Sequence, residues 1–160
     1  MAKILLVEDE PNLRELVGGR LETWGYKVET APDGYAAVAK ARAVHPNLII
    51  LDLMIPRMDG YTVCRLLKSS GMAETPIIIF SARSSPDDVR RGLDMGCNAY
   101  VTKPFEPEVL HAKIEELLHP KPKTEPAAPP AAEPPGQTAA PTLEAAQPVA
   151  AATTEPAKSA

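Results

Sequence analysis

Three short segments of this chain are runs of consecutive large apolar residues with polar side chains at or near their carboxyl ends. The runs are Ile4–Val7, Leu48–Leu53, which is interrupted by Asp52, and Ile77–Phe80. A strand that buries only one face alternates apolar and polar residues, so continuous runs predict strands buried on both faces, as in a parallel sheet. Two weaker β-like stretches, Tyr26–Thr30 and Ala99–Thr102, bring the expected number of strands to five.

The segments between these runs have the spacing of helices. After Pro11, a residue suited to a first helical turn, apolar side chains recur at intervals of three and four, at Leu13, Leu16, Val17, Leu21 and Trp24. Asp33, Asp59 and Ser85 are of the types that cap helix starts, and a last helix is expected from about Pro107 to Leu118. Five repeats of strand then helix predict an α/β fold in three layers, with a parallel sheet between helices.

Polar side chains converge on one edge of this predicted sheet. In parallel sheets the reactive groups gather at the carboxyl ends of the strands. Asp52 reaches that edge from the third strand, Glu8 and Asp9 follow the first, Ser81 ends the fourth and Lys103 follows the fifth. Clustered carboxylates repel one another unless they share a cation or a proton, and Mg²⁺ prefers oxygen ligands of this kind. Carboxylates with a hydroxyl and an ammonium are typical of phosphoryl-transfer sites.

Four motifs occur in order at these strand ends: LLVEDE, LDLMIPRMDG, IIIFSA and YVTKPF. Together they resemble the receiver domain of bacterial two-component response regulators, and the resemblance covers nearly all of residues 1–119. It implies a flavodoxin-like (βα)5 fold with the strand order 2-1-3-4-5. It also implies a signalling phosphoprotein rather than an enzyme that turns over external substrates.

The resemblance assigns a role to each polar residue at the edge. It makes Asp52 the acceptor of a phosphoryl group from a sensor histidine kinase or a phosphotransfer protein, with Mg²⁺ as the cofactor. It places Glu8 and Asp9 in the metal site, with Asp9 as the more direct ligand, and adds Asp52 itself and the backbone carbonyl of Met54. The chemistry is consistent, because an aspartyl carboxylate is a nucleophile toward phosphorus and forms an acyl phosphate. An apolar side chain at Met54 is expected to shield that acyl phosphate from water and to lengthen its lifetime.

Three further residues are assigned to transfer and switching by the same resemblance. Lys103 contacts the phosphoryl group, and its peptide bond to Pro104 is commonly cis in the family, an isomer that sequence does not show. Ser81 and Tyr100 correspond to the switch residues, whose movement changes the face made by the fourth helix, fifth strand and fifth helix and so regulates a partner protein. Blander interpretations stay open: Ser81 can bond nearby backbone, and Tyr100 can be permanently buried.

Two other classes of protein also stay open. Hydrolases with an aspartyl nucleophile on a similar sheet typically show the pattern D-x-D, but Met54 stands where the second carboxylate would be, which argues against turnover. The alternative to phosphoryl signalling is a receiver-like module that binds partners without phosphorylation. Quenching of Trp24 by Mg²⁺ would discriminate between them, because the first helix is expected to place this residue beside the metal cleft.

Composition narrows the partners and the compartment. Residues 1–119 hold 14 Lys and Arg against 17 Asp and Glu, so no basic surface predicts direct DNA binding. The apolar runs are far shorter than the ~20 residues that span a bilayer. Cys64 and Cys97 form no metal or redox motif, and no signal peptide precedes the first strand, so we expect a cytoplasmic protein with no membrane association. A dimer that forms on phosphorylation is a further expectation from the family.

The composition changes at Pro120. Residues 120–160 contain 10 Pro and 13 Ala, with Leu143 and Val149 as the large aliphatic residues. Such a segment buries too little apolar surface to offset the entropy of ordering it, which predicts a disordered tail after a receiver domain of residues 1–119. A spacer or solubilising role is favoured over a ligand for a proline-binding groove.

Overall fold

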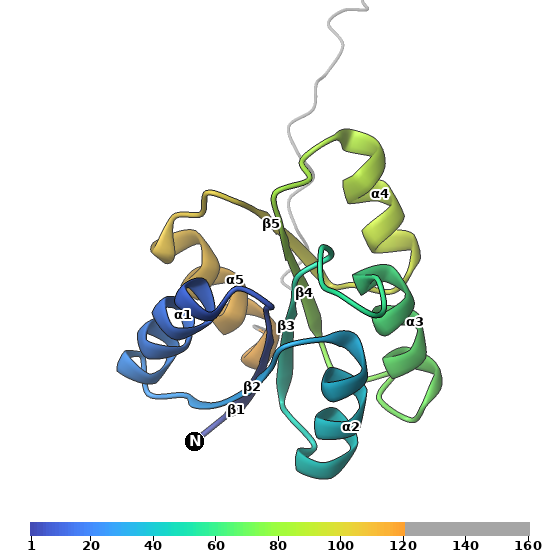
Figure 1. Ribbon diagram of the computed structural model, residues 1–160. Coiled ribbons are helices and arrows are strands. Elements are labelled where there is room, and N and C mark those ends of the chain that lie inside the picture. The colour runs from blue at the N-terminus through green and yellow to red at the C-terminus, as the bar shows by residue number, and fades with distance from the viewer. Residues whose placement is uncertain (121–160) are drawn as a thin grey trace, which may run out of the picture. The chain divides into compact units, whose positions relative to one another are not determined.

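The computed structural model describes residues 1–120, which form a parallel sheet covered by helices on both faces (Figure 1). The strands are β1 (Lys3–Val7), β2 (Lys27–Ala31), β3 (Leu48–Leu51), β4 (Ile77–Ser81) and β5 (Ala99–Thr102). The helices are α1 (Pro11–Thr23), α2 (Gly34–Val44), α3 (Gly60–Ser69), α4 (Pro86–Asp94) and α5 (Pro107–Leu118). The sheet has the order β2-β1-β3-β4-β5, and every pair of strands is parallel. The predicted flavodoxin-like fold and its strand order are confirmed.

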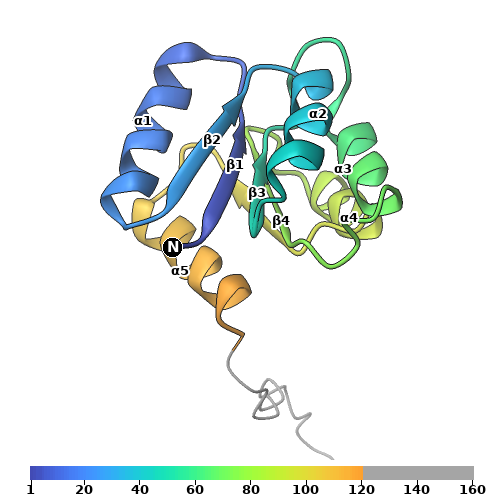
Figure 2. The same cartoon turned by 90° about the horizontal axis from the view of Figure 1, so that it is seen from below.

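The two faces of the sheet support separate apolar cores. In β1, Leu5 and Val7 belong to a core that also contains side chains of α2 and α3, whereas Ile4 and Leu6 belong to a core with α1 and α5. Figures 1 and 2 show the same division, with α1 and α5 on one face and α2, α3 and α4 on the other. Because successive side chains of a strand point to opposite faces, a strand that is covered twice must be apolar throughout. This explains the continuous runs in the sequence.

Side-chain caps fix the starts of the helices on the α2–α4 face. Asp33 accepts a hydrogen bond from the amide of Ala36 at the start of α2, and Asp59 accepts one from the amide of Thr62 at the start of α3. Ser85 Oγ accepts from the amide of Asp88 and donates to Asp88 Oδ2 at 2.7 Å, so Ser85 caps α4 as predicted. Only Gly92 is buried among the residues of α4, all of which are described, so this helix depends on its caps and polar contacts more than on a core.

The third strand ends earlier than the apolar run predicts. Its last residue is Leu51 instead of Leu53, and Leu51 lies opposite Val7 of β1. The amide of Asp52 still bonds to the carbonyl of Val7 at 3.0 Å, but Asp52 Oδ1 then accepts from the amide of Met54 at 2.9 Å. That local bond turns the chain away from the sheet and leaves Asp52 at its edge.

The predicted tail, residues 120–160, lies outside the described residues except for Pro120. Its predicted disorder, its role as a spacer and the boundary after residue 119 therefore stay predictions. Across residues 1–120, no helix has the length and apolar character that a membrane crossing requires.

Candidate functional site

The loops after β1, β3, β4 and β5 surround an open cleft of about 550 Å³ at the carboxyl edge of the sheet. Glu8, Asp9, Asp52 and Lys103 all line this cleft, as the sequence predicts. The strand register explains why Glu8 and Asp52 lie close together, because Val7 and Leu51 are paired and these acidic residues directly follow β1 and β3.

Lys103 joins two buried carboxylates. Its ammonium lies 2.6 Å from Asp52 Oδ2 and 2.8 Å from Glu8 Oε2, and Glu8 and Asp52 are only 1% and 4% exposed. Burial lowers the pKa of Lys103, but its hydrogen bonds to Asp52 and Glu8 outweigh burial and hold the pKa above the ordinary value. Lys103 therefore carries a permanent positive charge beside the Asp52 carboxylate. The Lys103–Pro104 peptide bond is cis.

Glu8 is the most confined carboxylate of the cleft. Burial raises the pKa of Glu8, although the bond and the charge of Lys103 oppose this effect. Its second oxygen, Oε1, accepts from the amide of Glu10 at 3.2 Å. Glu8 thus has partners on both oxygens, whereas Asp9 is exposed and open to a ligand from solvent.

The carboxylates of this cleft fit a hard divalent cation. Glu8, Asp9 and Asp52 each offer an oxygen atom, and these atoms lie within 4.8 Å of one another. Three carboxylates face one lysine, so the group has an excess of negative charge that a cation would offset. Oxygen ligands of this type suit Mg²⁺. The residues present therefore support a magnesium site, with Asp9 as its most accessible member.

The loop after Asp52 carries two more features of the site. Met54 is 57% exposed and lines the cleft, so its side chain covers the Asp52 carboxylate only in part. Gly60 packs directly beneath this loop: a Cβ there would lie 2.6 Å from the carbonyl oxygen of Asp52 and from Leu53 Cα. In the sequence, the Asp59-Gly60 pair indicates only a helix start. No sequence pattern predicts the close approach of Gly60 to the Asp52 loop.

Ser81 and Tyr100 connect to the backbone of the β4–α4 loop. Ser81 is buried, and its Oγ accepts from the amide of Arg83 at 3.2 Å, which is the blander of the two interpretations of this serine. Tyr100 is half-buried, and its hydroxyl donates to the carbonyl of Arg83 at 2.6 Å. Burial and then the charge of Tyr61 raise the pKa of Tyr100 to about 12. Both predicted switch residues thus meet at Arg83, and their roles as switches stay predictions.

Tyr61 is a residue of this region that sequence reasoning misses. It is buried in α3, and its hydroxyl donates to the carbonyl of Asp88 at 3.2 Å. The guanidinium of Arg91 lies 4.6 Å from the centre of its ring, while Arg83 approaches Asp88 to 3.7 Å. These contacts tie α4 to α3 and to the loop that carries Ser81, but helical spacing marks Tyr61 only as a core residue.

The predicted position of Trp24 is wrong. Pro11 and Leu13, at the start of α1, line the cleft, but Trp24 follows the last residue of this 13-residue helix. A helix of that length measures about 20 Å, so Trp24 lies at the far end from the acidic group. Its ring stacks on His111 of α5, with centroids 4.4 Å apart. Quenching of Trp24 is therefore no direct measure of metal binding.

The fold and the cleft together define a class of protein. It has five βα repeats and an acidic site at the carboxyl edge of its sheet, where a lysine pairs with an aspartate. Residues 4–115 match the family model described as response regulator receiver domain. The chain belongs to this receiver family of two-component systems.

Known proteins of the family resemble most of the described chain. The probable transcriptional regulator ycf27 of Cyanophora paradoxa is 43% identical over 116 residues, which is 72% of this chain and 48% of that protein. The structure of Vibrio cholerae chemotaxis protein CheY4 is 35% identical, with a TM-score of 0.70, and the match covers 74% of this chain and 99% of that one. The BeF3-activated receiver domain of Klebsiella pneumoniae RstA is 32% identical at a TM-score of 0.70, over 73% and 98% of the two chains.

This chain spans about half the length of the curated relatives that it matches. Those relatives are named as transcriptional regulators. The prediction that the chain has no direct DNA-binding role therefore finds no support. Dimer formation and a cytoplasmic location stay predictions.

Proposed function

We propose that this receiver domain accepts a phosphoryl group on Asp52 from a histidine kinase or a phosphotransfer protein, with Mg²⁺ as the cofactor. One observation carries the proposal: a buried aspartate, paired with Lys103 at 2.6 Å, opens into a cleft where two more carboxylates gather. A nucleophile, a fixed cation and a set of oxygen ligands are the parts that phosphoryl transfer requires.

Each oxygen of Asp52 already has a donor, which fixes the carboxylate before transfer. Oδ1 accepts from the amide of Met54, and Oδ2 accepts from Lys103. In transfer, an oxygen of Asp52 forms a bond to phosphorus, the bond from phosphorus to the donor nitrogen breaks, and its electron pair stays on the imidazole. Lys103 then transfers its hydrogen bonds to an oxygen of the phosphoryl group.

The metal would be held by Asp9, Glu8 and Asp52, with the carbonyl of Met54 as a further ligand. When bound, Mg²⁺ supplies positive charge that offsets the charge on the phosphoryl oxygens. Glu8 enters this set with Lys103 already bonded to one oxygen. Lys103 therefore releases Glu8 as it moves toward the phosphoryl group.

The phosphorylated aspartate acts on the β4–α4 loop. A phosphoryl group adds about −1.5 to −2 units of charge and strong acceptor oxygens. These oxygens attract the Ser81 hydroxyl, which in the structure accepts from the amide of Arg83. Since the carbonyl of Arg83 holds Tyr100, movement of the loop changes the α4–β5–α5 face, and a partner protein that binds this face is regulated.

Intact mass after incubation with Mg²⁺ and acetyl phosphate tests the proposal. We expect the full chain to gain one phosphoryl group, and we expect the gain to be absent in Asp52→Ala and after chelation of the metal. Asp94→Ala, which removes an exposed carboxylate of α4, is the matched control and keeps the gain. If wild type gains no phosphoryl group from acetyl phosphate or from a histidine kinase, the proposal fails and a phosphorylation-independent binding module replaces it.

Replacing Met54 by asparagine is expected to shorten the half-life of the phosphorylated form several-fold. The thioether lines the cleft beside Asp52 and excludes water from part of it, whereas an amide orders water near the acyl phosphate. The decay of the phosphorylated mass after removal of the donor measures this effect. An unchanged half-life in Met54→Asn contradicts the shielding role.

A further inference from the structure

Arg14 has no role in the steps above, yet it contacts the backbone of the whole acidic loop. Its Nη1 atom donates to the carbonyl of Glu8 at 2.8 Å and to the carbonyl of Asp9 at 3.3 Å. Its own amide donates to the carbonyl of Glu10 at 2.9 Å. The bond from the amide is an ordinary helical one, so the side chain of Arg14 holds two consecutive carbonyl groups, and both belong to predicted metal ligands.

The start of α1 has no conventional side-chain cap. Glu10 occupies the cap position but makes no side-chain hydrogen bond there, and the first turn of α1 has no acidic residue. The loop is instead held from within the helix by Arg14, a half-buried residue whose Nη1 atom donates to two adjacent carbonyl oxygen atoms. Without that guanidinium, the carbonyl groups of Glu8 and Asp9 lose a charged donor.

We propose that Arg14 is a positioning residue of the metal site, which holds the loop so that Glu8 faces Lys103 while Asp9 stays open to the cation. The inference rests on the proposed function, because it concerns the Mg²⁺ that phosphoryl transfer uses. A preformed loop binds a cation more tightly than a mobile one, since less chain entropy is lost on binding. Residues that orient metal ligands without touching the metal commonly contribute about 10- to 100-fold in affinity.

The positive charge of Arg14 is expected to weaken Mg²⁺ binding, whereas its positioning of the loop is expected to strengthen it. The two effects therefore change the Mg²⁺ affinity in opposite directions. A guanidinium near the carboxylates repels a cation, and its removal would then tighten binding. A clamp that positions the carboxylates weakens binding when it is removed. The sign of the change in affinity therefore separates positioning from simple charge.

The test is the Mg²⁺ affinity of the full-length chain, measured by calorimetry for wild type, Arg14→Gln and Arg20→Gln. Arg20 is the matched control, because it is an exposed arginine in the last turn of the same helix. We expect Arg14→Gln to bind Mg²⁺ about tenfold more weakly, with Arg20→Gln close to wild type. At limiting Mg²⁺, we also expect Arg14→Gln to gain the phosphoryl group more slowly than wild type.

Three results would overturn the inference. Equal affinity in the two variants, with only a lower unfolding temperature for Arg14→Gln, would leave Arg14 a merely structural contact. Tighter binding by Arg14→Gln would make it a repelling charge. Wild type that binds no Mg²⁺ would overturn the metal requirement of the proposed function as well, so failure of the function is distinct from failure of the inference alone.

Discussion

Lys103→Met is expected to destabilise the metal-free protein by about 3 to 5 kcal/mol at pH 7, which is the usual loss when one partner of a buried ion pair is removed. The substitution keeps most of the side-chain volume but removes the ammonium that bonds to both Glu8 and Asp52. Two buried carboxylates then face each other with no cation between them. Unfolding in urea, measured with a chelator present, gives the change in the free energy of unfolding.

The loss in Lys103→Met depends on pH in a defined direction. Burial already raises the pKa of Glu8 above its ordinary value of 4.5, and Lys103 opposes that rise. Without Lys103, the pKa of Glu8 rises further. A carboxyl group whose folded pKa is raised stabilises the protein below the unfolded pKa, and this stability is lost as the pH rises through the folded pKa. Lys103→Met should therefore be less impaired near pH 5 than at pH 7, and Mg²⁺ should restore stability at pH 7.

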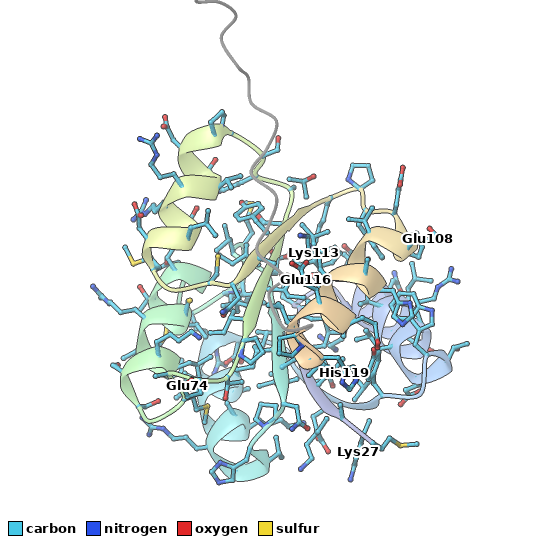
Figure 3. The ribbon with its side chains drawn as sticks, turned by 180° about the vertical axis from the view of Figure 1, so that it is seen from behind. Lys27, Glu74, Glu108, Lys113, Glu116 and His119 are labelled. Carbon is cyan, nitrogen blue, oxygen red and sulfur yellow. The ribbon has the colours of Figure 1, made fainter. Side chains whose placement is uncertain are left out.

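Lys113→Met is the control for this prediction. Lys113 pairs with Glu116 at 3.2 Å on the surface of α5, and both side chains are exposed (Figure 3). Exposed pairs of this kind contribute about 0 to 1 kcal/mol. Equal losses in the two variants, or a loss in Lys103→Met that does not change with pH, would contradict the assignment of Lys103 as the counter-charge of the buried carboxylates.

The convergence of the acidic residues and Lys103 was predictable because strand ends of a parallel sheet share one edge. Continuous apolar runs located those ends, and the side chain after each end follows from the register. The cap residues were predictable for a similar reason, since Asp33 and Ser85 act within three residues of their own position. The strand ends and the caps could therefore be predicted from the sequence, because both depend on residues close together along the chain.

The orientation of loop side chains and the fine spacing were not predictable. Ser81 bonds to the amide of Arg83, a choice that depends on the path of the β4–α4 loop. Trp24 was misplaced although its distance was predictable, because a helix that begins at Pro11 beside the cleft runs about 20 Å away from it before it reaches residue 24. Contacts of Arg14 with carbonyl groups, and of Gly60 with the Asp52 loop, involve backbone atoms that carry no residue-specific pattern.

Gly60→Ala is expected to destabilise the protein by roughly 1 to 3 kcal/mol, the usual range for overpacking. The new methyl group would lie 2.6 Å from the carbonyl oxygen of Asp52 and 2.6 Å from Leu53 Cα. Both are backbone atoms, so no rotation of a side chain relieves the contact, and the loop that carries Asp52 must move. We therefore expect slower gain of the phosphoryl group in addition to the loss of stability.

Gly19→Ala is the control that makes this prediction sharp. Gly19 lies within α1, and a Cβ there meets no atom within 4 Å. Alanine is about 0.8 to 1 kcal/mol more favourable than glycine in a helix interior, so the same substitution should stabilise the protein at residue 19. Thermal unfolding should show a lower stability for Gly60→Ala and a higher stability for Gly19→Ala. The rate of phosphoryl gain should fall only in Gly60→Ala. If Gly60→Ala is as stable as wild type and gains the phosphoryl group at the wild-type rate, the prediction is wrong. Asp52 would then function without the close packing of α3 against its loop.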